Sequence, residues 1–143
     1  MNFDKLLSEN KIERVEKSEF NLKSSEMDLE FAKKGLETQN YDRVMTVAYE
    51  AVLRAGNKIM NFLGYRAIGK THHKNVFEFL MVLKIDKDLA KYFDRIRKKR
   101  NEFLYRDVQN ISKEEAEEII KQAEKFVHKI RTFVHKIRTG CVK

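Results

Sequence analysis

Apolar residues recur at three- and four-residue spacing along most of the chain, which places their side chains on one face of an α-helix. The widest such face belongs to residues 41–63, where two apolar stripes lie side by side. A helix that is apolar over so wide an arc is expected at the centre of a bundle. The stripes consist of Val44, Ala48, Ala51, Ala55, Ile59 and Phe62, and of Met45, Tyr49, Val52 and Met60.

Further helices are predicted on both sides of this central segment. Ser24 or Ser25 is expected to cap a helix that ends near Asn40, because short hydroxyl side chains accept hydrogen bonds from the first free N–H groups. Thr71 is expected to cap another helix in the same way. The residues of that second helix predicted to face inward are Val76, Phe77, Leu80 and Leu83.

The second half of the chain predicts two longer helices. One is expected from about Asp86 to Tyr105. Residues 64–69, before the helix that Thr71 caps, predict a loop. The last helix is predicted to begin at Ser112, since Glu115 follows three residues later and completes a capping box. Its apolar residues alternate in steps of four and three, which is typical of a coiled-coil seam. The seam consists of Ile119, Ala123, Phe126, Ile130, Phe133 and Ile137.

The end of this last helix is a tandem repeat. The heptad FVHKIRT occupies residues 126–132 and occurs again at residues 133–139. Because seven residues keep the phase of the seam, the second copy is expected to lengthen the helix by about two turns.

The total length and composition favour an all-α protein with one core. The chain has 143 residues, no proline and five glycines, so few residues interrupt a helix. We expect residues 1–20 to form a short helix and a polar join. Residues 21–143 are expected to form an antiparallel bundle of four to five helices with an extended C-terminal helix.

Charge and cysteine content narrow the classes of function. A net charge of +8 favours nucleic acid, nucleotides or acidic partners. The single cysteine, Cys141, excludes an internal disulfide and a cysteine-based zinc site, and it favours a reducing cytoplasm. His128 and His135 are seven residues apart, too far along a helix to share a metal. We predict no metal, no cofactor and no membrane segment.

One basic residue lies where an apolar residue is expected. Arg100 falls on the apolar stripe of its helix, between Ile96 and Phe103. A buried arginine keeps its proton and is costly without a partner. Arg100 is therefore expected either to pair with a carboxylate, for which Glu50 or Asp94 is a candidate, or to bind an anion. Nearby cations, Arg97, Lys98 and Arg106, would strengthen the positive field around such an anion.

Four segments in this order resemble the small stand-alone HEPN domains of archaea and bacteria. They are LEFAKKGLETQNYDRVMTVAYEA, THHKNVFEFL, RKKRNEFLY and SKEEAEEIIKQAEKFV, and the resemblance runs from about Ser25 to Ile130. It implies an antiparallel helical bundle that is usually a homodimer. Many members of the family are metal-independent RNases, several act as toxins or defence effectors, and others partner a minimal nucleotidyltransferase.

The resemblance also implies a site. The motif of the family is an arginine, commonly followed by Asn, Asp or His, and then, after four to six residues, a histidine. Arg100 and Asn101 match its first two positions, and Tyr105 stands at the position of the histidine. A tyrosine with an ordinary pKa near ~10 is a poor general base at neutral pH. This branch of the motif therefore predicts weak or lost catalysis, with Arg100, Asn101 and Tyr105 as the candidate catalytic residues.

Three functions follow as alternatives. The first is an RNA- or nucleotide-binding protein of a toxin–antitoxin or stress module, with phosphate contacts from Arg97, Lys98, Arg100 and Arg106. The second is an active metal-independent endoribonuclease in which His72 or His73 replaces the missing histidine. The third is a non-catalytic module that docks a nucleotidyltransferase, with Arg100 held in a structural ion pair.

Overall fold

The computed structural model describes residues 2–106 and 111–140, and of residues 102–106 it describes the backbone alone. The described chain is an all-α bundle, as the apolar periodicity predicts, with two very short strands. The elements in chain order are α1 (Asp4–Ser8), β1 (Ile12–Arg14), α2 (Lys23–Gly35), α3 (Tyr41–Leu63), β2 (Tyr65–Ala67), α4 (His72–Leu83), α5 (Lys87–Arg106) and α6 (Lys113–Arg138).

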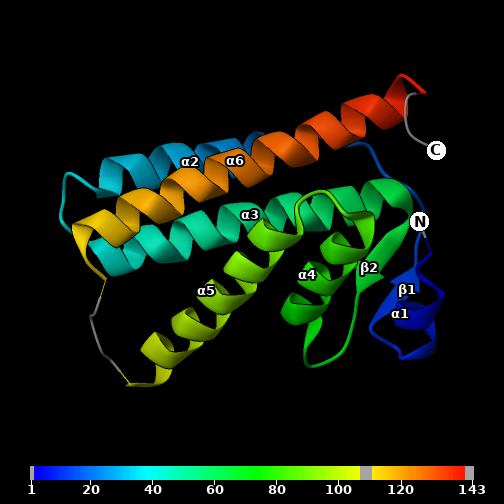
Figure 1. Ribbon diagram of the computed structural model, residues 1–143, viewed down its shortest axis with the longest axis horizontal. Helices are drawn as coiled ribbons and strands as arrows, with labels where there is room; N and C mark the ends of the chain where they lie inside the picture. Colours follow the sequence, from blue (N-terminus) through cyan, green and yellow to red (C-terminus); the bar gives the residue numbers. More distant parts are fainter. Residues whose placement is uncertain (1, 107–110, 141–143) are drawn as a thin grey trace.

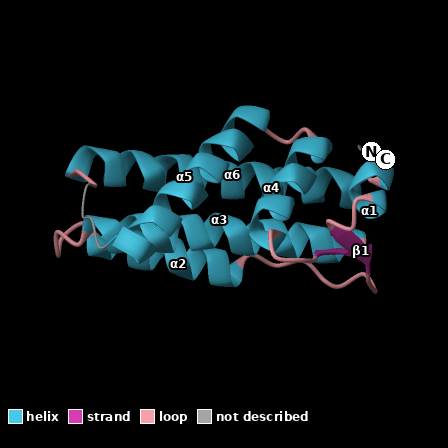
Figure 2. Cartoon of the chain, turned by 90° about the horizontal axis from the view of Figure 1, so that it is seen from below, coloured by secondary structure: helices cyan, strands magenta, loops and turns pink. Residues whose placement is uncertain are grey.

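Helix α3 is the centre of the bundle, as its wide apolar face predicts. Figure 1 shows α2 and α6 along one side of α3, and α4 and α5 along the other. The view from below in Figure 2 shows the long helices α3 and α6 running the length of the molecule, with the shorter α2 beside them. The α3 side chains that are fully enclosed are Met45, Ala48, Tyr49, Ala51, Val52, Ala55, Ile59 and Met60.

The N-terminal segment packs against the far end of α3 and α4. Strand β1 pairs antiparallel with β2, with Glu13 opposite Arg66, so part of the segment predicted as a loop is a strand. The ring of Phe3 stacks on Phe79 of α4 with centroids 4.3 Å apart. The start of the chain therefore contributes to the core.

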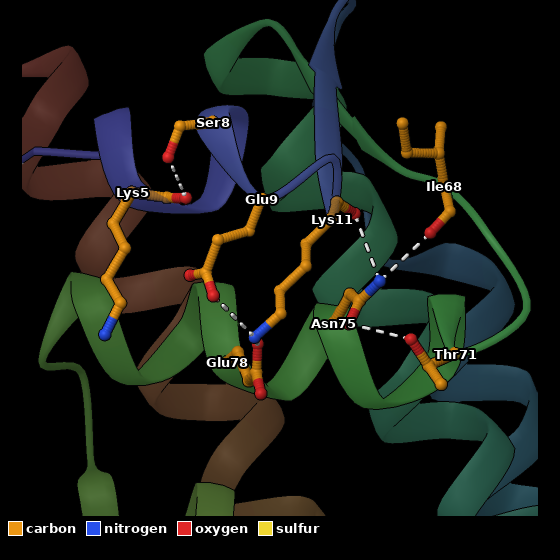
Figure 3. A network of polar contacts seen from close by, with 8 residues as sticks. All are labelled: Lys5, Ser8, Glu9, Lys11, Ile68, Thr71, Asn75 and Glu78. Atoms are coloured by element: carbon orange, nitrogen blue, oxygen red, sulfur yellow. Dashed lines mark hydrogen bonds and ion pairs between the residues drawn. The ribbon is translucent and has the colours of Figure 1, made fainter.

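A buried asparagine ties this segment to the start of α4, as Figure 3 shows. Asn75 is 2% exposed, and its Nδ2 donates to the backbone oxygens of Lys11 at 3.2 Å and Ile68 at 3.0 Å. Its Oδ1 accepts from the Thr71 hydroxyl at 3.3 Å. The Lys11 ammonium forms an ion pair with Glu78 at 2.9 Å, one turn further along α4. Hydrogen bonds of Asn75 with Lys11, Ile68 and Thr71 therefore fix the start of α4.

Two of the predicted helix caps differ from the structure. Leu22 occupies the N-cap of α2, and Ser25 lies inside the helix, where its buried hydroxyl donates to the Ala51 carbonyl at 2.8 Å. Thr71 does stand at the N-cap of α4, yet its hydroxyl bonds to Asn75 rather than to a free N–H group. The serine and threonine hydroxyls serve contacts between elements, which sequence spacing alone does not reveal.

The predicted start of α6 is confirmed, while its seam changes towards the end. Ser112 accepts a hydrogen bond from the backbone N–H of Glu115 at 3.1 Å. Ile119, Ala123, Phe126 and Ile130 are buried as expected. Beyond them Val134 is the buried residue, at 1% exposed, and Phe133 and Ile137 are only partly buried. The seam drifts because a straight helix turns slightly out of phase with a heptad.

The two copies of the heptad make different contacts. Arg131 of the first copy forms an ion pair with Glu26 of α2. Arg138 of the second copy donates to the Phe20 carbonyl at 3.2 Å and lies over the rings of Phe20 and Phe62. The second copy is therefore an integral part of the packing.

Candidate functional site

The inner face of α5 brings Arg100 to the centre of the molecule. Leu89, Phe93 and Ile96 are buried on this face at helical spacing, and Arg100 is the next residue of the same stripe. The apolar residues before it hold this face against the bundle. Arg100 is thereby directed towards the middle of α3 rather than into solvent.

Glu50 on α3 is the partner of Arg100, and the contact between them is long. Arg100 Nη2 lies 3.5 Å from Glu50 Oε1, with the side chains 21% and 37% exposed. The Nε atom of Arg100 is buried and has no hydrogen-bond partner in the described part of the chain. A guanidinium has five N–H donors. At least the Nε–H donor of Arg100 is therefore without an acceptor among the described residues.

Tyr49 forms the wall beside this arginine. The guanidinium carbon of Arg100 lies 5.5 Å from the centre of the Tyr49 ring, within range of a cation–π contact. Burial raises the pKa of Tyr49 to about 12, although the charges of Arg100 and Arg97 act to lower it. The phenol is neutral at physiological pH, and its hydroxyl is a second buried polar atom without a partner among the described residues.

The other predicted residues of the basic segment differ in their exposure and in their partners. Arg97 is mostly buried and committed to Asp94, with its Nε 2.9 Å from Asp94 Oδ1. Lys98 is exposed, and Asn101 is half-buried one residue beyond Arg100. The side chains of Tyr105 and Arg106 lie outside the described residues, and their predicted roles stay predictions.

The start of α4 brings His73 near the same cations. Because α4 and α5 are antiparallel neighbours, His73 lies near the arginines of α5. The Nδ1 atom of His72 lies 3.1 Å from the carbonyl oxygen of Gly69, three residues earlier in the chain. Burial lowers the pKa of His73, and the charges of His72, Arg100 and Arg97 lower it further. The His73 imidazole is therefore neutral near pH 7 and can accept a proton.

Glu50 also faces a second ion pair on its other side. Asp28 of α2 lies 3.2 Å from Arg54, one turn beyond Glu50 on α3. Burial raises the pKa of Asp28, Arg54 lowers it, and the negative charge of Glu50 raises it again, with the net effect upward. Glu50 thus lies between Arg100, which attracts its negative charge, and Asp28, which repels it.

Several predicted residues are not brought together. His128 and His135 are both exposed on α6 and belong to separate heptads. Within the described residues no group of His, Cys, Asp and Glu side chains could hold a metal ion. None of the described helices has the length and apolar character needed to cross a membrane. Arg100 does not line the hollows that are formed by described residues alone, and a cleft around it stays a prediction.

Sequence reasoning identified Arg100 and named Glu50 as a candidate partner, but it missed Tyr49. Tyr49 falls on an apolar stripe of α3 and looks like a core residue. The one available signal was its hydroxyl, since a phenol on a fully buried face requires a partner. Its place beside Glu50 in the chain could have drawn attention to it.

Comparison with known proteins identifies the family. The HEPN domain family model matches residues 18–133, which is most of the chain. The chain therefore belongs to the HEPN domain family, as its motif segments predict. A search of curated proteins finds no match to it.

Proposed function

We propose that this HEPN protein binds the phosphate groups of single-stranded RNA or of nucleotides at Arg100. The observation that carries the proposal is the buried Nε of Arg100, which has no partner among the described residues, beside an ion pair with Glu50 that is 3.5 Å long. An arginine kept for stability alone is expected to satisfy its donors with a close carboxylate. An incoming phosphate would supply the missing acceptors.

The surroundings of Arg100 suit an anion in two respects. Arg97 and the exposed Lys98 add positive field on the same helix, and Tyr49 excludes water from one side of the guanidinium. Glu50 opposes the anion and limits affinity. Because its contact with Arg100 is long and half open to solvent, we expect the anion to displace it at small cost.

A second candidate, metal-independent RNA cleavage, is favoured by His73. Cleavage by a neighbouring 2′-hydroxyl needs a proton acceptor near neutrality and a cation that stabilises the charged transition state. His73, with its lowered pKa, can act as the acceptor, and Arg100 can act as the cation. His72, beside it in the first turn of α4, is the alternative acceptor.

Binding can be tested with a labelled single-stranded oligonucleotide over a range of salt concentrations. Arg100→Ala should weaken binding and flatten the salt dependence, because phosphate contacts release counterions. Arg66→Ala is a matched control, since Arg66 also pairs with a glutamate, Glu13, but lies on β2. Equal losses in both variants would leave only nonspecific basicity. A stability loss in Arg100→Ala without a binding loss would support the interaction module instead.

Cleavage can be tested at the motif position. Tyr105→His restores the arginine-to-histidine spacing of the family and should raise cleavage that leaves 2′,3′-cyclic phosphate ends. A general acid–base group is typically worth ~10²–10⁴-fold, so the gain should be visible on a gel. Wild-type cleavage that is insensitive to Tyr105→Phe but lost in His73→Ala or His72→Ala would establish the second candidate.

The oligomeric state, the biological module and the protein partner are proposed from the family. We expect a homodimer in which two-fold symmetry brings two Arg100 clusters near one groove, acting within a toxin–antitoxin or stress module in the cytoplasm. A minimal nucleotidyltransferase is the protein partner the family suggests. Sedimentation at tens of micromolar would test the dimer, and a monomer there would count against it.

A further inference from the structure

The turn between α4 and α5 carries a second group of cations. Lys84, Lys87 and Lys91 line a hollow of about 640 Å³ whose apolar part includes the half-buried Met81 and Val82. Among the described residues, no aspartate or glutamate side chain lines this hollow. It combines positive charge with an apolar floor, the two properties that a nucleotide requires of its binding site.

The carboxylates next to these lysines in the sequence do not line the hollow. Asp86 and Asp88 line a separate hollow together with Tyr92 and Arg95. Asp86 is also bound to Lys129 of α6, with a distance of 2.6 Å between Nζ and Oδ2. Within the described part of the chain none of the three lysines takes part in an ion pair.

Two of the lysines stand where stability favours a different residue. Lys84 ends α4 in the left-handed region, with φ of 57°, where glycine is the usual residue because it has no Cβ. Lys87 begins α5, at the positive end of the helix dipole, where an acidic residue is preferred. Residues that break local rules tend to be kept for function. A merely soluble surface does not require lysine at these positions.

We infer that the hollow formed by Lys84, Lys87 and Lys91 is a second nucleotide subsite for single-stranded RNA. This inference rests on the proposed function, because it extends the RNA beyond Arg100. Arg100 lies nine residues past Lys91 in the sequence, which is about 13 Å along α5 and half a turn around it. A strand that contacts both must pass around the helix, and the exposed Arg95 and Lys98 lie between them.

RNA fits this hollow better than an acidic protein segment does. Phosphates repeat along a strand and can meet successive lysines, while the flat face of a base can cover Met81 and Val82. An acidic peptide would leave this apolar floor without a matching group unless it also carried apolar anchors. A free mononucleotide could fill the hollow but could not reach Arg100 at the same time.

The main test measures how binding depends on salt. The triple variant Lys84→Gly, Lys87→Gln, Lys91→Gln should lower the slope of log affinity against log salt by about 2 for a long single-stranded oligouridylate, since each phosphate contact with a single strand contributes ~0.7. Lys34→Gln is the control, because Lys34 is also exposed but lies on α2, across α3 (Figure 1). A slope equal to that of wild type would overturn the inference, as would stronger competition by poly-glutamate than by unlabelled oligouridylate.

A single substitution separates binding from folding. Lys84→Gly should weaken oligouridylate binding while leaving the thermal unfolding midpoint unchanged or higher, because glycine relieves the left-handed backbone. Gln39, with φ of 61° in the turn after α2, is the matched control. Gln39→Gly should have the same effect on unfolding and none on binding. Unchanged binding in Lys84→Gly, or equal losses in both variants, would contradict a subsite at this turn.

Failure of this inference can be told apart from failure of the proposed function. Binding of a long oligouridylate that depends on Arg100 but not on the three lysines would sink the subsite and leave the Arg100 site standing. Binding that depends on the lysines but not on Arg100 would support the subsite and sink the proposed function. The full inference requires both dependences in one long strand, and dependence on the lysines should disappear for a mononucleotide bound at Arg100.

Discussion

Arg100 and Glu50 face each other across the α3–α5 interface at 3.5 Å, the outer range of an ion pair. At this separation Glu50 neutralises part of the charge of Arg100, while the Nε of the guanidinium has no acceptor among the described residues. Glu50→Gln removes the opposing charge and keeps the size of the side chain. We expect it to raise the affinity for an oligonucleotide by about twofold to fivefold, the range that follows from the small free energy of a half-exposed ion pair.

Glu13→Gln is the control for this prediction, because Glu13 pairs with Arg66 on β2, beyond the C-terminal end of α3. It should leave the affinity unchanged in the same fluorescence titration. A Glu50→Gln variant that loses stability and gains no affinity would show that the pair is structural.

The second prediction concerns the pKa of His73. Burial is the largest cause of its lowering, and the charges of His72, Arg100 and Arg97 add to it. Arg100→Ala should therefore raise the pKa of His73, while burial keeps it below the ordinary value of 6.5. Titration of the imidazole signals by NMR measures this directly, with the exposed His128 as an internal control. An unchanged His73 pKa would show that Arg100 does not act on this imidazole.

The same lowered pKa sets the sign of a stability change with pH. The unfolded chain binds the proton of His73 more readily than the folded chain does. Folding should therefore lose free energy as the pH falls through about 6.5, the unfolded value. This loss should be smaller in His73→Gln, measured by urea unfolding at two pH values.

A third prediction concerns Asn75, whose side chain holds β1, the loop before α4 and the start of α4 together. Asn75→Ala removes two donated bonds and leaves the partly buried Ile68 carbonyl without that donor. We expect a loss of about 1–3 kcal/mol in the free energy of unfolding. Asn57→Ala, at an exposed position of α3, should have little effect. Equal losses in the two variants would contradict the role given to this network.

A fourth prediction concerns the close contact of α3 and α4. A Cβ at Gly56 would lie 2.6 Å from Val76 Cγ1 and 3.3 Å from Leu80 Cδ1. Gly56→Ala should destabilise the protein by about 1–3 kcal/mol through overpacking, less the gain of up to ~1 kcal/mol in helix propensity. Adding Val76→Ala should make the double variant more stable than the sum of the two single effects. Strict additivity would show that the contact is not the cause.

The helices were predictable because their apolar periodicity is long and regular, and the capping box at Ser112 is a local signal. The strands were missed because β1 and β2 have three residues each, too few to show alternation. Arg100 was predictable as a break in an apolar stripe. The approach of His73 to Arg100 depends on the antiparallel pairing of α4 and α5, and the burial of Tyr49 beside Arg100 depends on the contact of α3 with α5. Tertiary packing of this kind leaves no trace in residue spacing.

The tandem heptad of α6 gives the helix two nearly equivalent ways to lie against its neighbours. If α6 slid by seven residues towards its own N-terminus, Phe133 would replace Phe126 and Val134 would replace Val127 without any change of side chain. The misalignment is opposed at Ala123, which is completely buried, because Ile130 would have to enter its place. The slide is also opposed at the buried Ile119, whose place the larger Phe126 would have to enter, so the residues before the repeat fix the register of this self-similar helix.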